Sequence, residues 1–211
     1  RGQQKKNDAL RRAGHRLAEY VAGCVKELVP EETEVFELGG MIKRDAETEK
    51  LPSVVYVMQP QSQMEEMGYN DLVYGWDMNH VVPTVMHPNE ILDGAMVSGS
   101  FMPVSSKWST YDFQNCPNIK TLYREHGKTI NFLGVIMSNL NVALEQKERS
   151  AQFVAQIANS LGADGAVVAE EGYGNPDADF VACIVALENA GRTQIVALDK
   201  TGTITNGEPK V

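Results

Sequence analysis

Short apolar runs alternate with helix-like segments along the second half of the chain, and this alternation limits the fold more than any other feature. The runs are continuous and rich in β-branched residues, as in strands that are buried on both faces of a parallel sheet. Strands that alternate with helices form right-handed βαβ units. The sequence therefore predicts an α/β fold, a parallel sheet of βαβ units flanked by helices. The predicted strands are 53–58, 130–137, 165–169 and 194–198, and the predicted helices are 119–126, 142–161 and 176–189.

The first half of the chain is less regular. Apolar residues recur at steps of three and four from Asp8 to Leu28, which predicts an amphipathic helix that Pro30 ends. Between Asp77 and Pro103, prolines and glycines interrupt every periodic run, so this Pro/Gly-rich segment is expected to be irregular. The predicted domains are an N-terminal helix and linker over residues 1–52 and an α/β domain over 53–211, with a single domain over 8–211 as the alternative.

The charge balance excludes several classes of partner. The chain has 19 Lys and Arg against 28 Asp and Glu, a formal net charge of -9, which is the wrong sign for a surface that neutralises nucleic-acid phosphates. Its apolar stretches are far shorter than the roughly 20 residues that cross a bilayer. Three separated cysteines without a CxxC pattern predict a cytoplasmic protein. No apolar leader follows the basic first residues, so either export is absent or this start is not the native one. We expect no nucleic acid and no membrane among its partners.

Ligands of open parallel sheets bind at the carboxyl ends of the strands, so the turns after the strands are the places to search. The turn after residue 169 is the richest, because Gly172 and Gly174 let the backbone approach a ligand. Asn175 is expected to cap the following helix, with Pro176 at its first position. The candidate substrate-binding residues in this turn and in the turn after residue 137 are Asn139, Asn141, Glu171, Gly172, Gly174, Asn175 and Asp177.

Two interpretations of the turn after residue 169 stay open. In the first it is a well-capped helix start, with Asp177 and Asp179 complementing the helix dipole. In the second it is a polar small-molecule site, whose carboxylates accept hydrogen bonds from an ammonium group or orient a partner subunit. A dinucleotide site is disfavoured, because Asp177 stands where the Gly-x-Gly-x-x-Gly fingerprint needs its third glycine.

Other chemical motifs are weak. The histidines show no HxxxH or HExxH spacing, so no metal site is predicted. A GxSxG elbow is absent, although Ser98 and Ser100 place two hydroxyls in a glycine-broken turn. The stretch 199–207 is similar to the phosphorylation loop of P-type ATPases, in which Asp199 would accept a phosphoryl group. That family also needs transmembrane helices and a GDGxND motif, so a phospho-acceptor fragment is kept as an alternative.

A series of motifs between residues 8 and 190 resembles one particular family in its order. The motifs are Tyr74-Gly75, Val82-Pro83-Thr84, Asp93 to Gly99, Leu122 to Lys128, Asn139 to Val142, Lys147 to Ser150, Leu161 to Gly165 and Glu171 to Asp179. This order is similar to that of the component B proproteins (α/β subunits) of the glycine/sarcosine/betaine reductases, relatives of D-proline reductase.

The resemblance implies a subunit of a reductase complex that binds a small amino acid or an N-methylated amine for reductive C–N cleavage. Its partners are then other reductase subunits or further copies of itself, and a selenocysteine subunit takes over the carboxymethyl group. The alternative is a non-catalytic relative that keeps the fold and serves assembly or binding.

The family's processing site is altered in this chain. Family proproteins cleave themselves at an Asn-Cys bond just after Val-Ser-Gly, and the new terminus carries a pyruvoyl group that forms a Schiff base with the amine. The matching residues here are Ser100 and Phe101, so the cysteine is absent. We therefore expect a continuous backbone through these two residues, with Ser100 as the candidate catalytic residue if a pyruvoyl group forms. The junction at Gly191 and Arg192 also departs from the family and is expected to mark a gap rather than a tight turn.

Overall fold

The structure of the protein is a computed structural model. It describes residues 2–39, 46–63, 70–99, 108–172, 174–190, 194–198 and 204–206. Contacts divide the chain into two units, Arg1–Val35 and Phe36–Val211. The domain boundary after residue 52 stays a prediction. No helix within the described ranges is long and apolar enough to cross a membrane.

The first unit contains one helix, α1 (Gly2–Val25). The apolar periodicity predicts that this helix ends at Leu28, but α1 ends three residues earlier, at Val25. Gly23 weakens the last helical turn, and Pro30 disfavours helical backbone at the residue before it. The apolar side chains of Leu10 and Leu17 on this helix are exposed.

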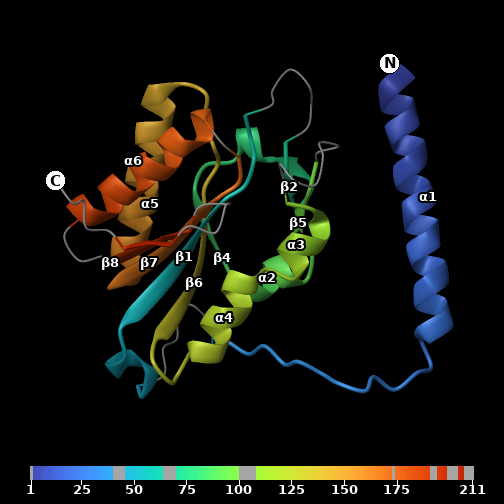
Figure 1. The fold of residues 1–211 in the computed structure, drawn as a ribbon, viewed down its shortest axis with the longest axis horizontal. Coiled ribbons are helices and arrows are strands. Elements are labelled where there is room, and N and C mark those ends of the chain that lie inside the picture. The colour runs from blue at the N-terminus through green and yellow to red at the C-terminus, as the bar shows by residue number, and fades with distance from the viewer. Residues whose placement is uncertain are drawn as a thin grey trace. The chain divides into compact units, whose positions relative to one another are not determined.

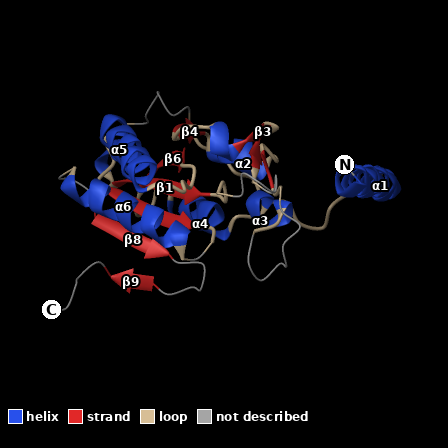
Figure 2. Cartoon of the chain, turned by 90° about the horizontal axis from the view of Figure 1, so that it is seen from above, coloured by secondary structure: helices blue, strands red, loops and turns tan. Residues whose placement is uncertain are grey.

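The second unit is built on a six-stranded sheet in the order β4-β6-β1-β7-β8-β9. Its strands are β1 (Ser53–Gln59), β4 (Thr84–Met86), β6 (Asn131–Met137), β7 (Gly165–Glu170), β8 (Gln194–Leu198) and β9 (Ile204–Asn206). The neighbours β6, β1, β7 and β8 are parallel, which confirms the predicted α/β fold and all four predicted strands. The edge strands β4 and β9 are antiparallel to their neighbours, and β9 lies beside β8 in Figure 2.

Helices cover both faces of this sheet, as Figure 1 shows. The helices are α2 (Pro88–Leu92), α3 (Thr110–Gln114), α4 (Pro117–Glu125), α5 (Leu144–Leu161) and α6 (Asn175–Asn189). On β1, Val55 and Val57 belong to the buried cluster under α5 and α6. Tyr56 and Met58 belong to the cluster under α2, α3 and α4. Alternate residues of β1 thus enter opposite layers, as expected of a strand that is buried on both faces.

Short strands occur inside and just before the segment 77–103 that is predicted to be irregular. β4 and β5 (Met96–Val97) lie inside it, as does the 3-10 helix Met78–His80, whereas β2 (Leu72–Val73) and β3 (Trp76–Asp77) lie at its start. The strands β3, β2 and β5 form a separate antiparallel sheet. A tight turn joins β2 to β3, with positive φ angles at Tyr74 (49°) and Gly75 (81°). Strands of two or three residues between prolines leave no periodic pattern, so sequence periodicity does not reveal them.

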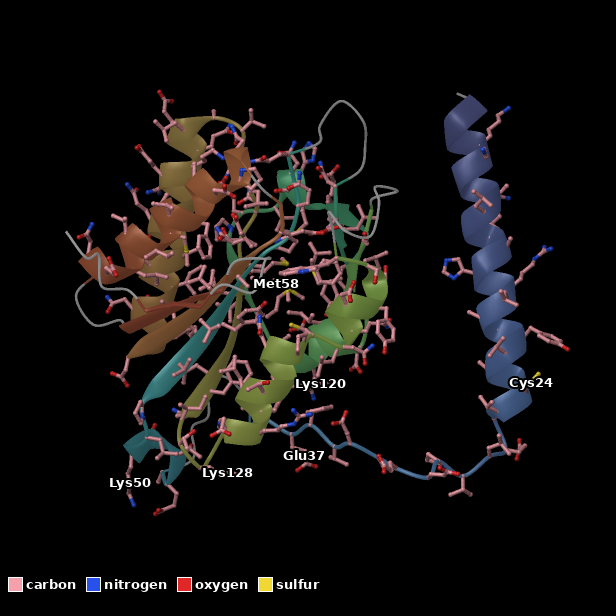
Figure 3. The ribbon with its side chains drawn as sticks, in the orientation of Figure 1. Cys24, Glu37, Lys50, Met58, Lys120 and Lys128 are labelled. Atoms are coloured by element: carbon pink, nitrogen blue, oxygen red, sulfur yellow. The ribbon has the colours of Figure 1, made fainter. Side chains whose placement is uncertain are left out.

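The order of the strands creates a topological switch point between β1 and β7. The chain leaves β1 toward α2, α3 and α4 on one face and leaves β7 toward α6 on the other face. These connections separate at the carboxyl ends of β1 and β7, which is where open α/β sheets bind their ligands. Lys50 and Lys128, labelled in Figure 3, lie just before β1 and β6 at the opposite end.

Candidate functional site

Gln59 and Glu170 lie opposite each other at the carboxyl ends of β1 and β7. Each lies two residues after a valine, Val57 or Val168, that belongs to the buried cluster under α5 and α6. Residues two apart in a strand point to the same face, so both side chains lie on the α5 and α6 face of the sheet. Each residue is 2% exposed. Gln59 Oε1 is buried and accepts no hydrogen bond from the described residues, and the same holds for Gln61 Oε1. A buried acceptor without a donor is costly, and a ligand that brings a donor group or positive charge removes that cost.

Glu171 anchors two loops at the same edge of the sheet. Its side chain is fully buried. Oε1 accepts a hydrogen bond from the backbone N–H of Trp108 at 2.6 Å, and Oε2 accepts one from the backbone N–H of Gln61 at 2.9 Å. Glu171, a candidate substrate-binding residue, therefore binds the protein's own backbone through both carboxylate oxygens.

The loop after Glu171 packs closely against the start of α6. Gly172 has a φ of 127°, and an ideal Cβ at this position would lie 2.8 Å from Cγ of Pro176. Gly174, with a φ of 77°, is the N-cap of α6, and no side chain caps the helix. The prediction that Asn175 is the N-cap is wrong. Asn175 is the first helical residue instead, because a glycine accepts the positive φ of the preceding turn, and its Oδ1 accepts a hydrogen bond from Gln63 Nε2 at 3.0 Å.

A buried ion pair between Lys147 and Asp179 joins the N-terminal parts of α5 and α6, with side chains that are 3% and 2% exposed. Lys147 Nζ also donates to the backbone carbonyl oxygens of Asn141 and Asn175. Asp179 accepts the backbone N–H of Asn141 at 3.0 Å and Gln63 Nε2 at 3.3 Å. Burial raises the pKa of the Asp179 carboxyl, whereas the hydrogen bonds from Lys147 and Asn141 lower it. Asp179 thus pairs with a lysine of the same chain, which neither of the two interpretations of this turn predicts.

Buried amide and hydroxyl groups hold the turn after β6. Asn139 Nδ2 donates to Asn141 Oδ1 at 3.1 Å, and Asn141 Nδ2 donates to Ser150 Oγ at 3.0 Å. Ser150 Oγ donates in turn to Asn139 Oδ1 at 3.2 Å. Both asparagines are buried, so this closed ring satisfies their side chains within the protein.

The structure brings most of the candidate residues to one edge of the sheet. Asn139, Asn141 and Asn175 meet around Lys147 and Asp179.

The other candidates form separate groups. Glu171, Gly172 and Gly174 follow β7, while the Asp177 side chain is exposed on the first turn of α6. Ser100, Phe101, the junction at 191–193 and the stretch 199–203 lie outside the described residues. The expectations on backbone continuity, on a gap and on Asp199 therefore stay predictions.

Sequence reasoning missed Gln59, Gln63 and Lys147. Lys147 carries a signal that was available, since it lies on the buried stripe of α5 with Ser150, Ala151 and Val154. A lysine in such a stripe requires a buried partner. Gln59, the last residue of β1, and Gln63, in the loop after it, follow no sequence pattern that marks them as site residues.

The described residues contain no group of three His, Cys, Asp or Glu side chains placed to hold a metal ion. Two of the three thiols, Cys116 and Cys183, are buried, and Cys24 is exposed. Burial raises the pKa of Cys183 to about 12. Its thiol therefore stays protonated and unreactive at neutral pH.

The fold and the polar switch point define an α/β protein with an acceptor-rich site at the carboxyl edge of a parallel sheet. The model of the glycine/sarcosine/betaine reductase component B subunits matches residues 1–208. The chain belongs to this family, as its ordered motifs predict.

Individual relatives differ in how similar they are to the chain. The betaine reductase complex component B subunit alpha of Peptoclostridium acidaminophilum is 74% identical over 189 residues, which cover 90% of this chain and 43% of the relative. The sarcosine reductase complex component B subunit alpha of the same organism is 38% identical over 192 residues, covering 91% and 44%. The glycine reductase complex component B subunits alpha and beta of that organism are 36% identical over 198 residues, which cover 94% of this chain and 46% of the relative. The chain thus spans less than half the length of these relatives. No solved structure matches it significantly.

Proposed function

We propose that the chain forms part of a component B subunit of a betaine reductase complex and contributes to the binding of betaine. The observation that carries the proposal is the contrast in identity, 74% to the betaine reductase subunit against 38% and 36% to the sarcosine and glycine reductase subunits. The chain shares about twice as many residues with the betaine reductase subunit as with the other two, and this contrast is our reason for choosing betaine as the substrate.

The altered processing site supports betaine as the substrate. Betaine is a glycine whose nitrogen carries three methyl groups, so this nitrogen has no N–H and cannot form a Schiff base with a carbonyl. An enzyme that acts on it has no need of a pyruvoyl group. Phe101, which lacks a heteroatom, stands in this chain where the resemblance places the cysteine that forms that group. On this proposal Ser100 is not converted, and the chain stays uncleaved.

The buried acceptors at the switch point also support a quaternary ammonium ligand. A trimethylammonium group is positively charged but donates no N–H bond, so it is stabilised by nearby oxygens without needing one particular hydrogen-bond geometry. Gln59 Oε1 and Gln61 Oε1 are such oxygens, and the buried carboxyl group of Glu170 adds further oxygens beside Gln59. We propose that these three residues recognise the ammonium end of betaine.

The remaining chemistry is assigned to partner subunits. Cleavage of the C–N bond requires an acceptor for the carboxymethyl carbon, and trimethylamine leaves with the electron pair of that bond. The family resemblance assigns the acceptor to a selenocysteine subunit. The described residues offer no exposed pair of thiols, since Cys116 and Cys183 are both buried. We therefore propose that the chain binds betaine and presents it to a partner that carries the selenium.

Calorimetric titration of the full-length subunit with betaine, sarcosine and glycine tests the proposal. We expect betaine to bind at least about tenfold more tightly than the other two, a difference of about 1.4 kcal/mol. Glu170→Gln should weaken betaine binding by a similar factor, whereas Glu188→Gln, an exposed change in the last turn of α6, should not affect it. Tighter binding of sarcosine or glycine would contradict the choice of substrate. Binding of none of them, with assembly intact, would favour the assembly role.

Mass spectrometry tests the same proposal independently. An intact chain across residues 100 and 101 that does not react with hydroxylamine is expected. A cleaved chain with a carbonyl terminus would contradict the proposal, because that group serves amines that form Schiff bases.

A further inference from the structure

Two buried carboxylates hold the residues on either side of the stretch 100–107. Asp71 Oδ1 accepts a hydrogen bond from the backbone N–H of Gly99 at 3.2 Å, and Glu171 Oε1 accepts one from the backbone N–H of Trp108 at 2.6 Å. Asp71 and Glu171 are both 0% exposed. A charged group at this depth is costly unless its oxygens are hydrogen-bonded, so these backbone contacts are strongly favoured.

The two carboxylates are connected through Gln61. Its backbone N–H donates to Glu171 Oε2 at 2.9 Å, and its carbonyl oxygen accepts the backbone N–H of Asp71 at 2.9 Å. A continuous series of hydrogen bonds therefore runs from Gly99 to Trp108 by way of the loop that follows β1. Gly99 and Trp108 are both tied by this series to the loops at the switch point.

Gly99 fits its place because it has no side chain. An ideal Cβ on Gly99 would lie 1.7 Å from the carbonyl oxygen of Asn70, a distance that no real pair of these atoms adopts. Asn70 directly precedes Asp71, so the close contact and the hydrogen bond hold Gly99 against the same short segment. Any larger residue must move this part of the chain away from Asp71.

We propose that Asp71 and Glu171 are positioning residues, which fix Gly99 and Trp108 beside the switch point without contacting the ligand. The same hydrogen bonds hold Gln61 and Glu171. Gln61 and Glu170, which directly precedes Glu171, are two of the residues proposed to recognise the ammonium end of betaine. Betaine binding therefore depends on both carboxylates. This last dependence rests on the proposed function, whereas the anchoring of Gly99 and Trp108 does not.

Limited trypsin digestion of the native full-length protein tests the anchor at Trp108, because trypsin cleaves after Lys107. Glu171→Gln replaces one acceptor oxygen with an NH2 group that faces a backbone N–H. We expect cleavage after Lys107 to accelerate about tenfold relative to cleavage after the exposed Lys128, the factor that loss of one hydrogen bond to a charged group produces. Glu188→Gln, the same change at an exposed site, should leave this ratio unchanged.

Gly99→Ala tests the other anchor without removing a buried charge, and it decides the matter if Glu171→Gln does not fold. We expect chymotrypsin to cleave after Phe101 about tenfold faster in this variant. An unchanged rate after Phe101 would overturn the proposal. So would parallel acceleration at every trypsin site in Glu171→Gln, because Glu171 would then support only global stability.

Titration with betaine separates the two proposals. Glu171→Gln and Gly99→Ala are each expected to raise the Kd for betaine about tenfold or more, with Glu188→Gln as the unchanged control. If the unmodified protein does not bind betaine, the proposed function fails while proteolysis still decides the anchoring. If it binds betaine and both variants bind equally well, the positioning role is overturned.

Discussion

Replacement of Lys147 by methionine removes the cation of the buried ion pair and keeps most of the side-chain volume. Asp179 then stays buried without its counterion, and breaking such a pair costs about 3–5 kcal/mol. The loss should lie near the lower limit, because Asp179 keeps the backbone N–H of Asn141 at 3.0 Å and Gln63 Nε2 at 3.3 Å. We therefore expect Lys147→Met to lower the free energy of unfolding by about 3 kcal/mol.

The double variant Lys147→Met, Asp179→Leu tests whether the two side chains stabilise the protein as a pair. Asp179→Leu alone leaves the Lys147 ammonium with two backbone carbonyl oxygens, those of Asn141 and Asn175, and should also cost about 3 kcal/mol. The double variant leaves no buried charge unpaired, so it should cost about 3 kcal/mol rather than the sum of about 6, which is a coupling of about 3 kcal/mol. Urea unfolding at neutral pH with unchanged slope measures all four proteins. Additive single losses would show that the two side chains do not act as a pair.

The pH dependence of Lys147→Met supplies a second check. Burial already raises the pKa of Asp179 above its ordinary value of 3.8, and removal of Lys147 takes away the largest opposing influence. A carboxyl whose pKa is raised in the folded state favours folding when it is protonated, and the penalty grows as pH rises above the ordinary value. The stability difference from the unmodified protein should therefore shrink as pH falls from neutral toward the ordinary value of 3.8. A constant difference over this range would contradict the assignment to Asp179.

Three further experiments test other parts of the structure: one labels the thiols of the native protein and two replace a single residue. In the native protein, a thiol reagent should label the exposed Cys24 quickly and Cys183 only after unfolding, because burial raises the pKa of Cys183 to about 12; equal rates would contradict its burial. Ser109→Ala removes the acceptor of the capping box of α3 and should lower the free energy of unfolding by about 1 kcal/mol in urea, whereas no change would indicate that the cap is dispensable. Gly172→Ala adds a Cβ 2.8 Å from Pro176 at a positive φ and should cost about 1–3 kcal/mol, with wild-type stability contradicting the close contact.

The regular part of the fold could be predicted because its signals are local. Four continuous apolar runs became β1, β6, β7 and β8, and the helix predicted over 142–161 is α5, which begins at Leu144. Gly162 after this helix has a φ of 72°, the left-handed conformation that ends helices. Each of these features is determined by neighbours within a few residues.

The candidate site could be predicted only in part, because its decisive contacts join distant residues. The sequence places polar residues after β6 and β7 but does not reveal that Lys147 binds Asp179, which is 32 residues away. It also gives no sign that Glu171 accepts the backbone N–H of Trp108, which is 63 residues away. The sequence places the N-cap of α6 one residue too late, because Gly174 and Asn175 both suit that position and only the turn geometry decides between them.

The central position of β1 has a consequence for how the chain folds. Its two neighbours are β6 and β7, so Ser53 must pair with Asn131, and Val54 with Gly165, long after β1 has been synthesised. Parallel pairings between such distant segments are slow to form. Until they form, the apolar run of β1 is an uncovered strand of the kind that aggregates. We therefore expect refolding yield to fall steeply with protein concentration, and Val55→Thr to improve that yield although it weakens the native core.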